Sequence, residues 1–422
     1  MKTITTLFFC IGLLYFASCS QNVAQQKSNV LTIMAMSDEF KTNGVIQDFE
    51  KMTGAKVDLQ IVPNEQYMNK LLPLLKTGKD VPDIFEGEAG YVKQVVNLGM
   101  SVNLSKPPYN ADTSEMYPYA VQMGTDDHGV LRALTWQCTP GGIFYRRSLA
   151  KKYLGTDSPE KVQQYFTSWD KMIELGKILK EKSHGQVKLL PGEGDLGVIF
   201  FANKAKPYVN SSNDFYLDPM ISKFLTVASE VRKDGLDAKL SAWSAPWMEG
   251  LNTKPGEAKI FCYVLPTWGL FFVMNGQKNS LGDWGLVSAP MSYYWGGTWL
   301  NIYKKSPNKE LAWKFIQMLT QNTKYMTAYA KRIGDFMSNK VVVDSIKSTM
   351  SSPLLDGQNH YAFFAQIADK LNASAVSPYD TTIDGIVGAV LGQYPSGDIN
   401  LQKAIGQIKN RVKEEFPQWT VN

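Results

Sequence analysis

The sequence predicts an α/β protein of two lobes, each with a mixed sheet and flanking helices, joined by segments that cross between them. Three observations predict this class. Strand-like and helix-like patterns alternate over residues 30–85, which is typical of an α/β layer. The chain of 422 residues is longer than one hydrophobic core usually supports. A strand-like run is broken in its middle at residues 140–142.

The first of these observations concerns the order of the early elements. Apolar alternation predicts strands, and apolar residues at helical spacing predict helices, over 30–36, 45–54, 57–61, 67–75 and 81–85 in turn. The order strand, helix, strand, helix, strand indicates a mostly parallel sheet. Ligands bind such sheets beyond the carboxyl ends of the strands. These ends carry Asp38 and Glu39 after the first strand, and Glu86 and Glu88 after the third.

The break lies between Val130 and Arg146, where an apolar run reaches Trp136, stops at Pro140-Gly141-Gly142 and resumes. Proline cannot donate to a sheet ladder, and glycine tolerates backbone angles that other residues avoid. A strand with such a break suits a chain that crosses between two lobes. The large ring of Trp136 beside a point that bends suggests a cleft that closes on a ligand.

The rest of the chain supplies the second lobe and two further crossings. Helices are expected after Thr167-Ser168 and over 224–231, and strands over 259–264, 284–287 and 300–303. The second crossing is expected near Pro290 and the third at 332–336. We therefore expect a first lobe of residues 30–136 with 291–332, and a second lobe of residues 137–290 with 333–422.

The first residues are typical of an export signal. Lys2 precedes an apolar run from Leu7 to Phe16, which is too short for a membrane span, and small residues come before Cys19. The pattern resembles a bacterial lipobox, although Phe16 stands where leucine is usual. We expect residues 1–18 to be removed, Cys19 to be lipidated and residues 19–29 to form a tether. Ordinary cleavage near Ser18 without an anchor is the alternative.

Composition excludes several classes of protein. The net charge is +5 with signs mixed along the chain, so a nucleic-acid partner is not expected. Three histidines are scattered without metal-ligand spacing, so we expect neither a metal nor a cofactor. Cys138 and Cys262 lie in apolar runs, and the sequence leaves open whether they are free thiols or a disulfide.

Four blocks resemble bacterial extracellular solute-binding proteins of carbohydrate-type ABC importers, the group that includes maltose-binding protein. The blocks lie at 49–62 with 82–85, at 134–149, at 256–259 with 266–269, and at 306–315. The resemblance implies a two-lobe periplasmic-binding-protein-like fold of type II. It also implies a monomeric, extracytoplasmic protein that is not an enzyme, held at the membrane only by its lipid. Such a protein would bind a sugar or oligosaccharide and deliver it to the transporter permease.

Sugars offer C–H groups on the ring faces and hydroxyls at the ring edge, so a sugar site needs aromatic planes and polar acceptors. Trp268 matches the position where the family commonly stacks an aromatic ring on a sugar. Trp136 is the second candidate, and either Trp295 or Trp299, which flank Gly296-Gly297, is expected to face the cleft. The alternative for each tryptophan is a place in the core.

The polar candidates are carboxylates and one tyrosine. Glu86 and Glu88 are expected to accept sugar hydroxyls, and Asp38 with Glu39 are weaker candidates of the same kind. The second lobe offers further candidates in a glycine-rich loop and at the start of a late helix, namely Glu193, Asp195, Tyr379 and Asp380. Arg332 and Asp335 are expected to form an ion pair at the third crossing.

Three rival interpretations remain open at this point. A glycoside hydrolase needs two carboxylates about 5 to 10 Å apart across a cleft, and one strand end supplies both Glu86 and Glu88. A binding protein for a polyamine, glycerol phosphate or a metal chelate keeps the fold and changes the ligand. A phosphate ligand would require clustered basic residues, and Arg146-Arg147 is the candidate pair. We prefer to interpret this pair as the solvated start of a helix. An adhesin or receptor domain of the same fold is the third.

Overall fold

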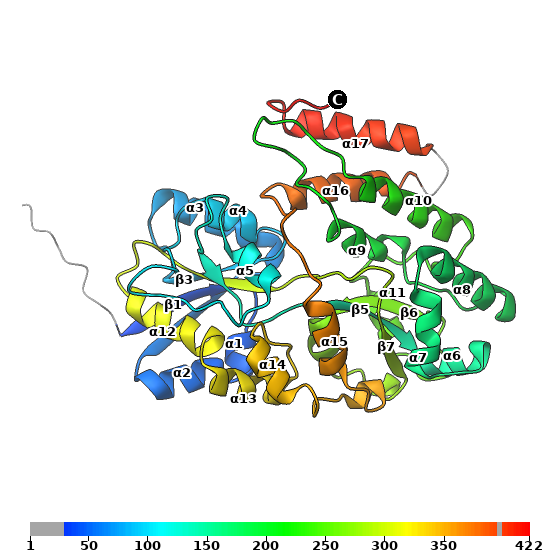
Figure 1. The fold of residues 1–422 in the computed structure, drawn as a ribbon, viewed down its shortest axis with the longest axis horizontal. Coiled ribbons are helices and arrows are strands. Elements are labelled where there is room, and N and C mark those ends of the chain that lie inside the picture. The colour runs from blue at the N-terminus through cyan, green and yellow to red at the C-terminus, as the bar shows by residue number, and fades with distance from the viewer. Residues whose placement is uncertain (1–28, 395–398) are drawn as a thin grey trace, which may run out of the picture.

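The computed structural model describes residues 29–394 and 399–422. Its two sheets lie at opposite ends of an elongated molecule, each with its own helices (Figure 1). We call the first sheet with its helices the first lobe, and the second sheet with its helices the second lobe. The predicted leader and Cys19 lie outside the described residues.

The first sheet is mixed and has the strand order β2-β1-β3-β8-β4. Its strands are β1 (Val30–Ala35), β2 (Lys56–Ile61), β3 (Ile84–Glu88), β4 (Ala133–Leu134) and β8 (Thr298–Ile302). As predicted, β1 is parallel to both β2 and β3. Strand β8 returns late in the chain and runs antiparallel to β3, so that Glu88 pairs with Thr298 at the end facing the second lobe.

Helices cover both faces of the first sheet because the residues of β1 alternate between two cores. Leu31 and Ile33 point toward Phe49 of α2 and Phe315 of α12. Met34 points the other way, into a core with α3 and α4. The helices of this lobe are α1 (Glu39–Thr42), α2 (Val45–Thr53), α3 (Asn64–Thr77), α4 (Val92–Asn97), α5 (Pro118–Gly124), α12 (Lys309–Thr320) and α13 (Thr323–Ile333).

The second sheet is antiparallel, with the order β6-β5-β7. Its strands are β5 (Gly141–Arg146), β6 (Cys262–Pro266) and β7 (Trp284–Val287). The strand predicted at 259–264 begins later, because Ile260 pairs singly with Lys188 before β6 starts. The helix start predicted after Thr167-Ser168 is confirmed. Ser168 is the N-cap, since its hydroxyl accepts the amide of Lys171 at 3.2 Å.

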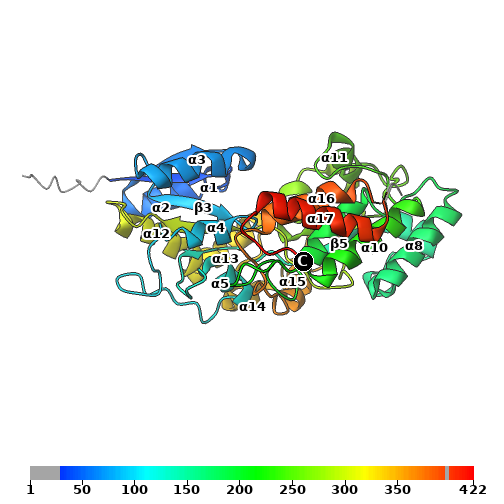
Figure 2. The same ribbon diagram turned by 90° about the horizontal axis from the view of Figure 1, so that it is seen from above.

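The remaining helices surround this sheet and the base of the junction (Figures 1 and 2). They are α6 (Arg147–Leu154), α7 (Pro159–Val162), α8 (Trp169–Lys182), α9 (Gly197–Phe201), α10 (Pro219–Lys233), α11 (Ala245–Leu251), α14 (Lys340–Ile346), α15 (His360–Ala368), α16 (Asp380–Leu391) and α17 (Leu401–Glu415). Short helical turns occur at Gln163–Phe166, Glu193–Leu196, Gly269–Val273, Lys278–Ser280 and Pro353–Leu355. Among the described helices, none is long and apolar enough to cross a membrane.

Three crossing segments run side by side between the lobes. The central one passes from β4 to β5, and its Cys138 amide donates to the Phe336 carbonyl at 2.8 Å. On its other side the amide of Gly141 donates to the Tyr293 carbonyl, also at 2.8 Å. Single bridges, Gln137 with Met337 and Pro140 with Tyr294, mark the same pairings. The predicted crossings therefore form one hydrogen-bonded ribbon.

The glycine at the break is required by close packing. A Cβ at Gly141 would lie 2.0 Å from Cζ of Tyr293, a residue that is fully buried. The hydroxyl of Tyr293 donates to the Gly142 carbonyl at 2.8 Å and so fixes its ring against the crossing. Gly141 does not have a positive φ, so close packing and not backbone conformation requires glycine at this position.

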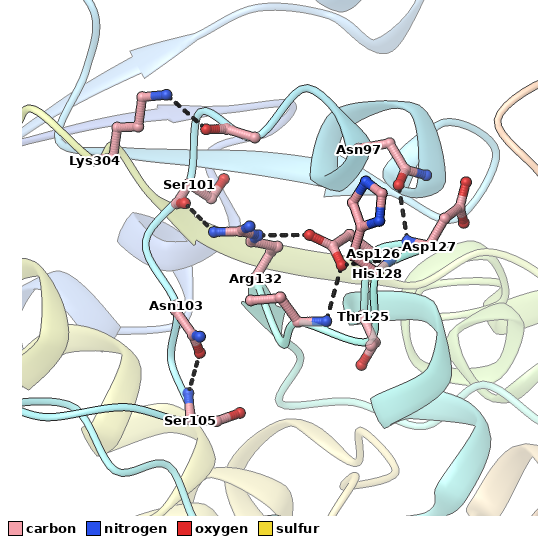
Figure 3. A network of polar contacts seen from close by, with 12 residues as sticks. Asn97, Ser101, Asn103, Ser105, Thr125, Asp126, Asp127, His128, Arg132 and Lys304 are labelled. Atoms are coloured by element: carbon pink, nitrogen blue, oxygen red, sulfur yellow. Dashed lines mark hydrogen bonds and ion pairs between the residues drawn. The ribbon is translucent and has the colours of Figure 1, made fainter.

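The outer edge of the first sheet is held by an ion pair between buried Asp126 and partly buried Arg132 (Figure 3). Asp126 accepts Nε of Arg132 at 2.8 Å and the amides of His128 and Val130 at 3.0 and 2.8 Å. Nη1 of Arg132 also donates to the Ser101 carbonyl at 3.0 Å. The network fixes the turn that leads into β4, and therefore the start of the central crossing.

Cys138 and Cys262 are free thiols, and both are buried. Burial raises the pKa of both Cys138 and Cys262 well above the usual range of a thiol. Within the described part of the chain, no group of three or more histidine, cysteine, aspartate or glutamate residues is placed to hold a metal ion.

Candidate functional site

A cavity of about 620 Å³ lies where the carboxyl ends of the first-sheet strands face the second lobe. The first lobe contributes Ser37, Glu39, Asn64, Glu65, Glu88 and Thr298 to its lining. The crossing segments contribute Gln137, Trp295, Gly296 and Gly297, and the second lobe contributes Trp243, Trp268, Phe271 and Phe272. A volume of this size is ordinary for a small-ligand site. We call it the first cavity.

Three indole rings form an aromatic wall on the second-lobe side. Trp268 donates its Nε1 to the Trp295 carbonyl at 2.8 Å, and the two rings meet edge to face with centroids 5.2 Å apart. Trp243 stacks nearly parallel on Trp268 at 5.9 Å and 17°. The wall therefore offers flat apolar ring surfaces, and the indole N–H of Trp268 already has a hydrogen-bond acceptor.

The backbone explains how these rings come together. Trp268 follows the end of β6 at Pro266 and opens the helical turn Gly269–Val273. A Cβ at Gly296 would lie 2.9 Å from Nε1 of Trp268, and Gly296 has φ +70°. Only glycine combines that left-handed angle with so close an approach. Gly296 thus lets the crossing strand carry Trp295 against Trp268.

Carboxylates form the opposite wall. Oε1 of Glu39 accepts the Tyr329 hydroxyl at 3.2 Å, and Oε2 of Glu88 accepts the Gly90 amide at 2.7 Å. Burial raises the pKa of each carboxyl to about 7, against the opposing effect of these hydrogen bonds. Among the described residues neither carboxylate forms an ion pair. Both are therefore poised between neutral and ionised forms and keep acceptor capacity for a ligand.

Four predicted residues line the first cavity, namely Trp268, Trp295, Glu88 and the weaker candidate Glu39. Asp380 lines a smaller cavity next to it, together with Trp295 and Glu88. The structure thus assembles five of the predicted residues around one junction. It also settles which member of the pair faces the cleft, since Trp295 is half-buried there and Trp299 is fully buried. Ligand binding by these five residues stays a prediction.

Trp136 and Trp299 lie in the core instead, with exposed fractions of 1% and 0%. Trp136 donates Nε1 to Asp335 at 3.2 Å and packs edge to face on Phe40. Trp299 donates Nε1 to the Ala120 carbonyl at 2.7 Å. The two rings fill the space under the crossing ribbon, so their faces are not available to a ligand in this structure.

Glu86 and Asp38 do not line either of these cavities. Glu86 is buried beside the first cavity, and its Oε2 accepts the Met36 amide at 2.7 Å. Burial, opposed by this hydrogen bond and aided by the charge of Glu39, raises the pKa of Glu86 to about 8. Asp38 is exposed at the start of α1 and does not cap it with its side chain.

The other predicted residues of the second lobe have structural partners. Glu193 forms an ion pair with Arg232, which also pairs with Asp237 at 2.9 Å. Asp195 accepts Nε1 of Trp247 at 2.9 Å. Tyr379 packs edge to face on Trp419, which follows the C-terminal end of α17, and the ring centroids are 4.8 Å apart. Glu193, Asp195 and Tyr379 do not line the first cavity or its neighbour.

The ion pair expected between Arg332 and Asp335 is wrong. Arg332 pairs with Asp48 at 2.9 Å. Asp335 is fully buried and accepts Trp136, and burial raises its pKa well above the usual range. The solvated helix start preferred for Arg146-Arg147 is also wrong at Arg146. That side chain is buried over the ring of Trp284, 3.5 Å from Asp283.

Several lining residues were not found from the sequence. Gln137, Asn64, Phe271 and Phe272 gave no pattern of their own. Trp243 had a signal, because a large ring stands alone in the polar loop before α11. It is 48% exposed and has φ +68°, a strained angle that in proteins often accompanies binding sites.

Comparison with known proteins agrees with this architecture. The family model described as bacterial extracellular solute-binding protein matches residues 44–354, and the chain belongs to that family. A solved extracellular solute-binding protein of family 1 superposes with a TM-score of 0.80 at 19% identity, covering 91% of this chain and 99% of that one.

Two further structures share the fold. One is an ABC-transporter-associated binding protein of B. animalis subsp. lactis in complex with β-1,6-galactobiose, with a TM-score of 0.74, 19% identity and coverage of 93% and 98%. The other is the sugar-binding protein MalE of Xanthomonas citri, with a TM-score of 0.73, 18% identity and coverage of 92% and 98%. These likenesses establish the two-lobe fold for this chain.

Proposed function

We propose that the protein binds a sugar or oligosaccharide between its lobes and delivers it to the permease of an ABC transporter. The observation that carries the proposal is the first cavity, in which Trp243 and Trp268 of the second lobe, together with Trp295 of a crossing segment, face carboxylates of the first lobe. The lobe boundaries we propose are those expected above, 30–136 with 291–332 and 137–290 with 333–422.

The two walls match the two kinds of surface on a sugar. Trp268 and Trp295 suit the apolar ring faces, and Glu39 and Glu88 suit the hydroxyls of the ring edge. A micromolar ligand needs about −8 kcal/mol. Hydrogen bonds to charged groups contribute about 1.5–3 kcal/mol each, so a few of them with one or two stacked rings meet that requirement after ordering costs.

Closure of the lobes follows from the same arrangement. A ligand held by both walls makes its full set of contacts only when the lobes are together, so it shifts the population toward the closed form. The permease would read that form. The structural neighbours from B. animalis and Xanthomonas citri, described as binding β-1,6-galactobiose and sugar, support a saccharide as the ligand.

A polyamine is the second candidate ligand, because carboxylates facing indole rings also suit a cation. Glycerol phosphate is less compatible, since the described residues that line the first cavity include no lysine or arginine. We further propose that the protein returns its ligand unchanged, in contrast to a glycoside hydrolase. Export with a lipid at Cys19, anchoring at the outer face of the cytoplasmic membrane and a monomeric state complete the proposal.

A titration of tryptophan fluorescence tests the proposal. The purified protein is titrated with neutral mono- and oligosaccharides, spermidine and glycerol phosphate, and the recovered ligand is checked for cleavage. We expect a saccharide to change the emission, and Trp268→Ala to weaken its binding at least about tenfold because a stacking face is lost. Trp268→Phe should keep most of the affinity.

Tyr216→Ala removes a half-buried ring that does not line either cavity, and it serves as the control. Normal saccharide binding by Trp268→Ala would contradict the site. Binding of spermidine with no response to any saccharide would show that the ligand is a polyamine and not a sugar. Release of a cleaved sugar would favour the glycoside hydrolase interpretation.

A further inference from the structure

A second cavity of about 280 Å³ adjoins the first, and the two share Glu88, Trp295 and Gly296 in their linings. Its other walls come from both lobes. The first lobe contributes Ala89, Gly90 and Met123. The second lobe and the crossings contribute the remaining lining residues, which are Val198, Phe201, Ala202, Tyr294, Val376, Asp380, Thr381 and Asp384. The shared residues form a partition, so a ligand passing Trp295 enters both cavities.

The polar group of the second cavity is Asp384 on α16. Its Oδ1 accepts the Tyr208 hydroxyl at 2.6 Å, whereas no described residue donates to its other oxygen. Asp380, one turn earlier, is fully engaged by Lys204 at 2.6 Å and by the Ser377 hydroxyl at 2.6 Å. Asp380 therefore anchors the helix, and Asp384 retains an acceptor for a ligand. Burial raises the pKa of Asp384 to about 7; the charge of Lys204 opposes this shift and the charge of Asp380 adds to it.

The apolar group is Phe201 at the end of α9. Its ring is half-buried and rests edge to face on Phe224, with centroids 5.5 Å apart. Val198, one turn earlier on the same helix, lines the cavity beside it. One aromatic plane and one open carboxylate thus meet here, as they do at Trp268 and Glu88 in the first cavity. The same pairing of groups occurs on both sides of Trp295.

The second cavity lies at a contact between the lobes. Thr381 donates its hydroxyl to the carbonyl of Gly90, and the Gly90 amide donates to Glu88 at 2.7 Å. A substituent that fills this cavity therefore touches α16 on one side and the end of β3 on the other. Its binding energy adds to lobe closure and not only to affinity.

We infer that the second cavity is a further saccharide subsite, and that the ligand is an oligosaccharide whose successive rings lie on either side of Trp295. This inference rests on the proposed function. The smaller volume suits a single ring, since cavities of about 300 Å³ are at the lower end for small ligands. A monosaccharide would fill only the first cavity and make no contact with Phe201 or Asp384.

Isothermal titration of two matched series tests the inference: glucose, maltose and maltotriose, and galactose with β-1,6-galactobiose. In a series that binds, we expect at least about a tenfold gain in affinity from the monosaccharide to the longer sugar. Asp384→Asn and Phe201→Ala should each remove most of that gain and leave the monosaccharide affinity unchanged. Asp170→Asn, which removes an exposed carboxylate on α8, should leave the gain intact.

The thermal unfolding midpoint is recorded for each variant, and the Phe201 variant keeps the test decisive if Asp384→Asn does not fold. A monosaccharide that binds as tightly as its oligomers overturns the inference and leaves the proposed function standing. A gain in affinity that survives both variants overturns it as well. If no saccharide of either series or of the wider panel binds, the proposed function falls and the subsite falls with it.

Discussion

The first lobe holds carboxylates of low solvent exposure in two places, and the partners of these carboxylates differ between the two. At the outer edge, Asp126 is paired with Arg132 and receives two backbone amides (Figure 3). At the cleft, Glu39 and Glu88 have a hydrogen bond each and no cation among the described residues. Burial raises the pKa of Asp126, but the bonds from Arg132 and the amides outweigh it and hold the pKa below its usual range. The pKa of both cleft carboxyls is raised to about 7.

The difference separates a structural carboxylate from one held for a ligand. A satisfied pair stabilises the fold, and removal of one partner leaves an uncompensated charge. An unpaired carboxyl at low solvent exposure costs stability in its ionised form, and that cost is recovered only when a ligand supplies donors. Stability should therefore depend on the outer edge and affinity on the cleft.

The largest expected effect is on stability at the outer edge. Arg132→Ala should lower the free energy of unfolding by about 2–3 kcal/mol, which is less than the roughly 3–5 kcal/mol of a fully buried pair because Arg132 is partly open to solvent. Saccharide affinity of the folded variant should not change. Denaturant unfolding and titration measure the two quantities. Lys171→Ala, which breaks an exposed pair on α8, is the control, and an Arg132 variant as stable as that control would contradict the comparison.

The next effect is on affinity at the cleft. Glu88→Gln should weaken saccharide binding by about tenfold, because a charge-assisted hydrogen bond becomes a neutral one. Its unfolding free energy should stay the same or rise, since glutamine still accepts the Gly90 amide. The control is Glu414→Gln on α17, which changes the net charge by the same amount at an exposed site. Unchanged affinity with lowered stability would reverse the roles assigned to the two regions.

A smaller effect appears in the pH dependence of stability. Glu86 has a pKa of about 8 in the folded chain and an ordinary value near 4.5 when unfolded. The folded state thus binds more protons between these values, so stability from this group is complete below pH 4.5 and is lost as pH rises toward 8. Glu86→Gln should flatten that slope by up to about 1.4 kcal/mol per pH unit. A slope identical to that of the parent protein would show that Glu86 ionises normally.

The smallest effect lies at acid pH and has the opposite sign. Because the pKa of Asp126 is lowered on folding, its contribution is present above its ordinary value of 3.8 and is lost as pH falls through the folded value. Asp126→Asn should lower stability at neutral pH and remove part of the acid-limb loss. Unfolding midpoints between pH 2 and 5 measure it, and an acid limb as steep as in the parent protein would count against the pairing.

The sequence predicted those features that follow from local pattern. Parallel pairing of β1 with β2 and β3, the crossing at Pro140 and the helix start after Ser168 each depend on a short run of residues. The place of Trp268 in the cavity was also expected, but on a family resemblance, since nothing in its local spacing distinguishes it from a core tryptophan.

The sequence could not predict how deeply each side chain is buried. Trp136 and Trp295 both stand near glycines at crossings, yet one is 1% exposed and the other lines the cavity. Glu86 and Glu88 share a face of β3, and only the amide of Met36 on the neighbouring strand segment marks Glu86 as the covered one. Such differences arise from segments far apart in the chain. Trp243 reaches the site from the loop before α11, where its own backbone has φ +68°.

A crystal structure with the tightest-binding saccharide tests the central claim most directly. The account predicts a sugar ring whose face lies on Trp268 and whose hydroxyls donate to Glu88, with both lobes in contact with the ligand. A saccharide bound away from the junction, or one that touches a single lobe and leaves Trp268 uncontacted, would contradict it.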